Sequence, residues 1–166
     1  FHWDSGTISS GGLDLILNAP MTTSASNLRL SSTDIFHNDN SGASILATGQ
    51  LDLDASEFTN SVGSILELSA PLATDTLFID QDFTAAGAFR NFGTLNKTGL
   101  GRLEFFSGGT LTFENTGTLD IQSGDVFVDN TTTILNGTLM GSGPLIWNGG
   151  TLQASLNIAA GAALEI

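Results

Sequence analysis

Three aspartates near the middle of the chain form an acidic patch whose carboxylates are the type of ligand that a metal ion takes. Asp75, Asp80 and Asp82 lie in one short stretch around the sequence FIDQDF. Calcium takes several hard oxygen ligands at once, and neighbouring carboxylates supply such oxygens. The sequence therefore predicts a candidate calcium site at these three residues, and it indicates no other metal and no organic cofactor.

Other combinations of reactive residues lack the context that catalysis needs. Ser32, Asp34 and His37 have the residue types of a hydrolytic triad, but no Gly-x-Ser-x-Gly turn presents the serine. Lys97 follows Asn96, at a place where a phosphate-binding loop requires glycine. We therefore predict no catalytic residue and no enzymatic activity.

Composition limits the chemistry further and restricts the kinds of partner. The 166 residues include no cysteine, which excludes disulfides, thiolate catalysis and cysteine-based metal sites. There are 17 acidic residues against 4 basic ones, so the net charge is −13. Such a charge repels nucleic acid and anionic membranes and attracts cations. We expect no nucleic-acid partner and, without a long apolar run, no direct insertion into a membrane.

The elements that carry these residues are revealed by a recurring asparagine. In Phe89-Arg90-Asn91 and Phe113-Glu114-Asn115 the asparagine follows a phenylalanine by two residues, and similar triplets with phenylalanine, isoleucine or serine in first place recur along the chain. The seven marker asparagines are Asn18, Asn38, Asn60, Asn91, Asn115, Asn136 and Asn157. Their intervals are 20, 22, 31, 24, 21 and 21 residues, which indicates a repeated structural unit.

The local pattern shows what this unit is. Apolar and polar residues alternate in short runs such as Leu51-Asp52-Leu53-Asp54, and clusters of Gly, Asn and Ser separate the runs. Three short strands in roughly 20–24 residues are typical of one coil of a parallel β-helix. The sequence predicts an all-β, right-handed β-solenoid of about seven coils over residues 1–166, with one insertion near 80–87. On these strands Asp52 and Asp54 are expected on the exposed outer face.

The marker asparagines then have a structural role. We expect all seven to lie at one corner of the solenoid and to hydrogen-bond to one another from coil to coil, as stacked amides do in other cross-β structures. Asparagine also tolerates the backbone of a sharp corner. The phenylalanine two residues earlier is expected to point into the core.

The stretch from Gly49 to Ile65, GQLDLDASEFTNSVGSI, resembles the repeat of filamentous-haemagglutinin-type secreted proteins. Later stretches such as NFGTLNKTGLG and IWNGGTL resemble repeats of large bacterial surface and autotransporter-like proteins. This resemblance implies a β-helix and a role as an adhesin, a stalk or a matrix protein. It brings no catalytic residue. It also implies an extracellular or cell-surface location, and we expect the chain to be a segment cut from a longer repeat protein.

The function expected from the sequence is therefore structural and adhesive rather than enzymatic. Expected partners are other surface proteins or carbohydrate, with end-to-end self-association or tandem repeats as a further option. An alternative is a carbohydrate-binding or pectate-lyase-like β-helix, whose ingredients would be Asp80, Asp82, Arg90 and Arg102. A second alternative is an ice-binding solenoid. Such proteins need a flat, regular face of repeated T-x-T motifs, and this sequence contains one clean motif, Thr110 to Thr112.

Overall fold

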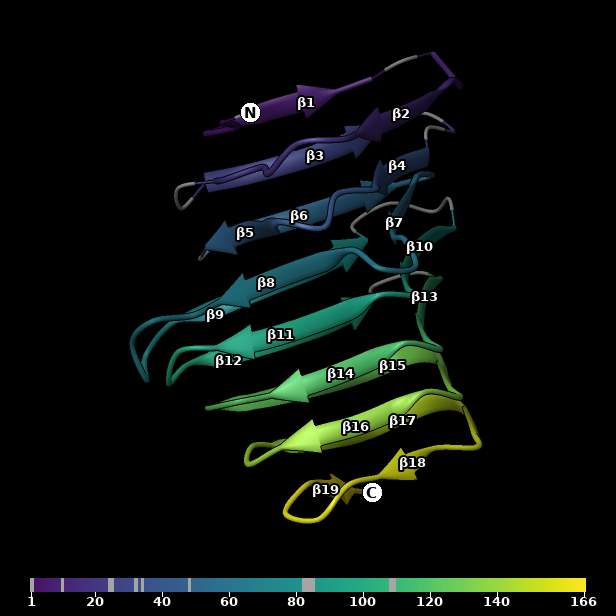
Figure 1. Ribbon diagram of the computed structural model, residues 1–166. Helices are drawn as coiled ribbons and strands as arrows, with labels where there is room; N and C mark the ends of the chain where they lie inside the picture. Colours follow the sequence, from purple (N-terminus) through teal and green to yellow (C-terminus); the bar gives the residue numbers. More distant parts are fainter. Residues whose placement is uncertain are drawn as a thin grey trace.

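The computed structural model describes residues 2–9, 11–23, 26–31, 33, 35–47, 49–81, 86–107 and 110–166. In these residues all regular structure is β-strand, and parallel strands from successive turns of the chain pair side by side (Figure 1). The strands form a solenoid of about seven turns. The predicted all-β, parallel β-solenoid architecture is therefore confirmed.

Strand pairing divides the solenoid into three stacks, and successive turns of the chain contribute to each stack in order. The first stack contains β1 (Gly6–Ile8), β3 (Ser26–Ser31), β6 (Gly49–Asp54), β9 (Thr76–Gln81), β12 (Arg102–Ser107) and β19 (Ala163–Glu165). The second contains β2 (Asp14–Leu17), β4 (Ile35–Asn38), β7 (Glu57–Asn60), β10 (Gly87–Asn91) and β13 (Leu111–Asn115). The third contains β5 (Ala43–Ala47), β8 (Ile65–Ser69), β11 (Thr94–Thr98), β14 (Thr118–Ile121), β16 (Thr138–Gly141) and β18 (Asn157–Ile158).

Two long strands pass from the first stack into the second. The first part of β15 (Asp125–Leu135) pairs with β12, and its last residues pair with β13. The next strand of this kind, β17 (Pro144–Ala154), pairs with β15 along both parts. The backbone bends at Asn130, where φ is 50°, and at the equivalent Gly149 in the following turn, where φ is 93°. These positive angles suit asparagine and glycine.

Alternation along each strand places one set of side chains in the core. On β12, Leu103 and Phe105 are buried, whereas Arg102 and Glu104 are partly exposed. Because parallel strands pair in register, the same positions face inward in the strands above and below. The core is therefore a set of columns that follow the axis of the solenoid.

Phenylalanine forms the most regular of these columns. Phe36, Phe58 and Phe89 are at most 1% exposed, and their rings stack with centroids 5.2 and 5.3 Å apart. Phe105, from the first stack, packs edge-on to Phe89 at 5.3 Å and stacks on Phe113 at 4.0 Å. The phenylalanine predicted to precede each marker asparagine thus lies in the core in these turns.

Four of the marker asparagines form a buried ladder next to this column. The side-chain amide Nδ2 of Asn38 donates to Oδ1 of Asn60 at 2.8 Å, Asn60 donates to Asn91 at 2.7 Å, and Asn91 donates to Asn115 at 2.6 Å. All four side chains have 0% exposure. Each of the first three amides also donates to a backbone carbonyl of a later strand, as Asn91 does to Thr118 at 2.8 Å. The ladder therefore ties four turns together along the axis.

The other three marker asparagines are outside this ladder, which corrects the prediction for Asn18, Asn136 and Asn157. Leu17 is the register partner of Asn38, and Leu135 is the register partner of Asn115. Asn18 and Asn136 therefore lie one residue past the ladder, and both are exposed. Asn157 is also exposed and pairs with Thr138. In register with the ladder, these turns have Leu17, Leu135 and the exposed Ala154 in place of an asparagine.

A recurring glycine allows the turns to approach closely at the next corner. A Cβ atom added at Gly117 would lie 2.1 Å from the carbonyl oxygen of Gly93, and one at Gly137 would lie 1.9 Å from that of Gly117. Real Cβ atoms do not come so close to a carbonyl oxygen, so a larger residue at Gly117 or Gly137 would force the backbone to shift. The repeated sequence Gly-Thr-Leu is explained by this contact and by the inward leucine that follows.

The extra residues between Asn60 and Asn91 are divided among three places, the connections from β7 to β8, from β8 to β9 and from β9 to β10. The connection from β8 to β9, residues 70–75, has three residues more than the connection from β11 to β12, residues 99–101. Asp80 and Gln81 belong to β9, and Gly87 begins β10. The predicted insertion near 80–87 is thus corrected in its bounds, and residues 82–85 of it lie outside the described residues.

Asp52 is buried rather than exposed, contrary to the prediction from alternation. Its exposure is 8%, whereas Asp54 is partly exposed. In register, Asp52 lies between Arg29 on β3 and Asp80 on β9, and Oδ2 of Asp52 is 3.5 Å from Nε of Arg29. Arg29 also contacts Asp54 at 2.5 Å through Nη2. Side chains from neighbouring turns therefore cover Asp52, although it points away from the core.

Candidate functional site

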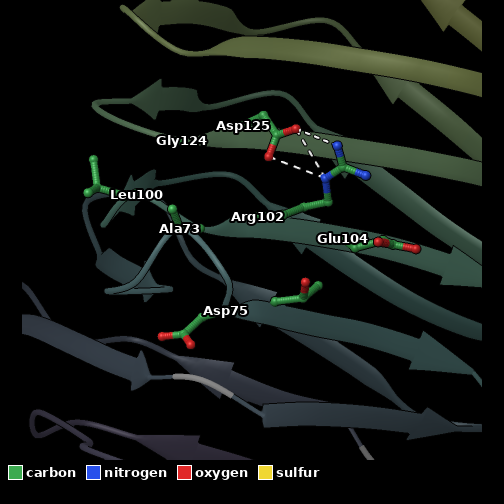
Figure 2. A pocket seen from close by; sticks show the side chains of 9 residues that line it. Ala73, Asp75, Leu100, Arg102, Glu104, Gly124 and Asp125 are labelled. Carbon is green, nitrogen blue, oxygen red and sulfur yellow. Dashed lines mark hydrogen bonds and ion pairs between the residues drawn. The ribbon is translucent and has the colours of Figure 1, made fainter.

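A hollow of about 460 Å³ on the outer side of the first stack is the candidate site (Figure 2). It lies beside β12, where the connections that precede β9 and β12 form its rim. Its lining residues are Ala73, Asp75, Thr76, Leu100, Gly101, Arg102, Glu104, Gly124 and Asp125. Three of them are acidic and one is basic, so the hollow has an excess of negative charge.

Arg102 is held firmly on one side of this hollow. Its guanidinium donates to the carboxylate of Asp125 on the next turn, with Nη2–Oδ2 at 2.8 Å and Nε–Oδ2 at 3.1 Å (Figure 2). The Cζ atom of Arg102 also lies 4.5 Å from the ring centroid of Phe127. The hydrogen bonds to Asp125 raise the pKa of Arg102 above its ordinary value, although burial acts in the opposite direction. Carboxylate and aromatic ring together hold this cation in place.

The surroundings of Glu104 disfavour the ionised form of its carboxyl group. Burial raises the pKa of the Glu104 carboxyl above its ordinary value; the charge of Arg102 opposes this effect, and Asp129 and Asp125 add to it. The side chain points outward from β12, since Leu103 and Phe105 on either side are buried. A positive charge placed in the hollow would therefore favour the ionised form of Glu104.

Lys97 lies in the wall behind the hollow and has no exposed surface. Its ammonium donates to three backbone carbonyls, those of Thr98 at 2.8 Å, Gly99 at 3.0 Å and Ser123 at 3.2 Å. Burial lowers the pKa of Lys97, and the charge of Asp125 partly offsets this effect. The lysine takes a place that Ile121 occupies in the next turn, so its chain packs in the core while its charge binds the corner carbonyls.

The remaining basic side chains also have acidic partners. Arg90 contacts Glu57 at 2.9 Å through Nε and Glu114 through Nη1. Arg29 contacts Asp52 and Asp54. Since the chain has four Lys and Arg residues in all, every one of them is engaged by acceptors of the chain itself. Carboxylates, rather than Lys or Arg side chains, are therefore the charged groups that the outer surface presents to a ligand.

Two of the three predicted calcium ligands, Asp75 and Asp80, are not brought together. Asp75 precedes β9 and accepts a hydrogen bond from the amide of Leu72 at 3.0 Å, whereas Asp80 lies near the other end of that strand and is 8% exposed. Five residues of strand separate the two by about 16 Å. Asp82 lies outside the described residues. Within the part of the chain that the structure describes, no three His, Asp or Glu side chains are grouped to hold a metal ion.

The described members of the other predicted sites are not grouped either. His37 is on β4 in the second stack, near Asp14, and its suggested partners Ser32 and Asp34 lie outside the described residues. Arg90 is on β10 in the second stack, whereas Arg102 is on β12 in the first. The arrangement that a pectate-lyase-like site would need at Asp80, Arg90 and Arg102 is therefore not formed by these three.

Glu104 and Asp125 are site residues that sequence reasoning did not single out. Their meeting with Arg102 depends on strand register, which pairs Arg102 with Asp125 and Glu104 with Phe127. One signal was available, because RLEFF at 102–106 and DVFVD at 125–129 are equivalent strands of adjacent units. Aligning these strands position by position would have placed the arginine beside the aspartate.

The elevated pKa of Glu104 leads to a pH-dependent prediction. The folded protein binds this proton more tightly than the unfolded chain, so the free energy of unfolding falls as pH rises from about 4.5 through the folded pKa. Replacing Glu104 with glutamine should remove this loss, and the variant should gain stability relative to the wild type towards neutral pH. Urea midpoints measured from acid to neutral pH would show this difference.

A matched control is Asp120→Asn on β14 in the third stack, which also removes one partly exposed carboxylate. This variant should keep the pH profile of the wild type over the same window. Parallel profiles for Glu104→Gln and the wild type would show that burial of Glu104 does not matter for folding.

Comparison with known proteins adds no further assignment. No family model, no curated protein and no solved structure matches this chain. Among the described residues there is also no helix long and apolar enough to cross a membrane.

Proposed function

We propose that this chain is a non-enzymatic structural and adhesive rod of a large bacterial protein that is secreted or displayed at the cell surface. The observation that supports this proposal is the use made of the recurring residues. The buried ladder from Asn38 to Asn115 and the phenylalanine column beside it join one turn to the next. Because the repeated residues form the contacts between coils, further coils can be stacked to lengthen the rod. A long rod can present its outer faces to a partner.

The partners proposed for such a rod are other surface proteins or carbohydrate. Its outer faces are strongly acidic, and its basic side chains already have acceptors within the chain. Polyanions would therefore be repelled, since adhesion to them depends on available Lys and Arg. The contact is expected on the sides of the rod.

The proposal predicts that the protein binds without changing its partner. The pure protein is incubated with neutral and acidic polysaccharides, with and without calcium, and their chain length is measured over time. No shortening is expected, because the described residues group no carboxylates around a metal and Arg90 and Arg102 are in ion pairs on separate stacks. Shortening of any of these polymers would contradict the proposed function.

A second candidate function, polysaccharide cleavage, rests on Glu104. A carboxyl group with a raised pKa in a hollow is the kind of group that donates a proton to a leaving oxygen. If cleavage occurs, Glu104→Gln should abolish it and Asp120→Asn should leave it unchanged. This pair of variants separates a true activity of the hollow from a contaminating enzyme.

A further inference from the structure

We propose that the outer surface of β9, β12 and β15 binds an extended, lysine- and arginine-rich segment of a partner polypeptide. This inference gives the adhesive function proposed above a site and a ligand class, and in that sense rests on it. The surface is defined by five residues, Phe78, Glu104, Phe106, Phe127 and Asp129, and is called the acidic–aromatic surface below.

Strand register arranges these five residues, together with the buried Asp80, as a checkerboard. In one column Glu104 lies between Phe78 on the turn before and Phe127 on the turn after. In the neighbouring column Phe106 lies between Asp80 and Asp129. Adjacent strands are about 4.8 Å apart, so each carboxylate has aromatic neighbours and each ring has acidic ones. A cation that binds here meets a negative charge and the face or edge of a ring together.

Two of the three phenylalanine side chains of this surface are available for contact. Phe78 and Phe106 are each 37% exposed, although both belong to strands in the interior of the first stack. Their outward direction follows from alternation, since Leu77 and Ile79 flank Phe78 and are buried. Partly exposed aromatic rings on the outer face of a sheet suit a binding surface.

Arg102 shows how this surface holds a cation. Its guanidinium lies over Phe127 and bonds to Asp125, at the edge of the checkerboard. The hollow on its other side contains Glu104, whose carboxyl has an elevated pKa through burial and through the charges of Asp129 and Asp125. A second guanidinium or ammonium beside Glu104 would relieve this unfavourable charge.

Charge complementarity selects the occupant among the alternatives. All four Lys and Arg side chains of the chain have intramolecular acceptors, so a second copy of this chain would bring mainly carboxylates to the surface. Nucleic acid and acidic polysaccharide would be repelled for the same reason. A basic polypeptide brings the missing charges, and arginine and lysine also bind aromatic rings.

The spacing of the columns favours an extended polypeptide. Glu104 and Phe106 are two residues apart on β12, which places the columns about 6.7 Å from each other. Alternate side chains of an extended peptide that lies along β12 have this same spacing. A segment with a basic residue at every second position would therefore place its charges over both columns.

The experiment measures the affinity of the full chain for a fluorescein-labelled peptide of alternating arginine and serine, by fluorescence anisotropy at low salt. We expect Glu104→Gln and Phe106→Ala each to weaken binding about two- to fivefold, and the double variant about tenfold. Asp120→Asn, which removes one charge from the third stack, should change the affinity by less than about twofold. A peptide of alternating glutamate and serine should not bind.

Two results would overturn the inference. If Asp120→Asn weakens binding as much as Glu104→Gln while Phe106→Ala has no effect, attraction is due to net charge alone. If a chitosan oligomer binds at Glu104 and Phe106 and the arginine peptide does not, the ligand is an aminated polysaccharide. Either result leaves the non-enzymatic rod standing, since that proposal is tested by the polysaccharide assay.

Discussion

Replacing Phe89 with alanine is expected to lower the free energy of unfolding by about 4 kcal/mol, the largest effect among the substitutions considered. The ring has 0% exposure and contacts three others, stacking on Phe58 at 5.3 Å, meeting Phe105 edge-on at 5.3 Å and lying 6.3 Å from Phe113. Its loss removes apolar burial and opens a cavity between two turns, which rigid neighbouring strands cannot close. Urea unfolding followed by circular dichroism would measure the change.

Phe106→Ala is the control for this prediction. It removes the same side chain from a position that is 37% exposed on the outer surface, so it should cost at most about 1 kcal/mol. A cost at Phe106 equal to that at Phe89 would mean that the inward and outward sides of the strands are assigned wrongly. The same control also shows that weaker peptide binding by Phe106→Ala is not due to unfolding.

Replacing Asn91 with leucine is expected to destabilise the protein by about 3 kcal/mol, because it interrupts the buried ladder in its middle. Asn60 loses the acceptor of its 2.7 Å hydrogen bond, and the side-chain oxygen of Asn115 and the backbone oxygen of Thr118 lose their donor. Buried polar groups without partners cost more than the hydrogen bonds themselves contribute. Leucine fits the volume, so the effect isolates the polar contacts.

Asn136→Leu is the matched control for the ladder. Asn136 follows the same sequence pattern, but it is exposed and lies one residue beyond the register of the ladder. The substitution should change the free energy of unfolding by less than about 0.5 kcal/mol. Equal costs at the two asparagines would refute the distinction between ladder and non-ladder positions.

The fold could be predicted because its signals are local and repeated. Alternation gives strands, glycine gives corners, and a recurrent Phe-x-Asn triplet marks equivalent places in each turn. The triplet did not predict the position of the buried asparagine where its first residue is isoleucine or serine instead of phenylalanine. In Ile134-Leu135-Asn136 the inward positions are occupied by Thr133 and Leu135. The repeat was therefore identified correctly, but the inward positions lie one residue earlier than the triplet predicts.

The candidate site was harder to predict because it depends on contacts between turns. The alternation within its own strand predicts that Asp52 is exposed, yet Arg29 and Asp80 from the adjacent turns cover it. Glu104 and Asp125 have no distinctive local sequence, and they meet Arg102 through pairing of strands 23 residues apart. Asp75 and Asp80 were grouped because they are close in sequence. An extended strand, however, holds residues five positions apart far from each other in space.

The ladder of four asparagines has a consequence for how the chain folds. Its hydrogen bonds join residues only 22, 31 and 24 positions apart, so each closes a short loop at a small cost in chain entropy. Strand pairing closes loops of similar length in the other turns, so the additional hydrogen bonds of the ladder are what favour the turns from β4 to β13 as a nucleus on which the remaining turns are added one by one. Stopped-flow refolding of Asn91→Leu should then be slowed, rather than its unfolding accelerated; the reverse partition would place the nucleus elsewhere in the rod.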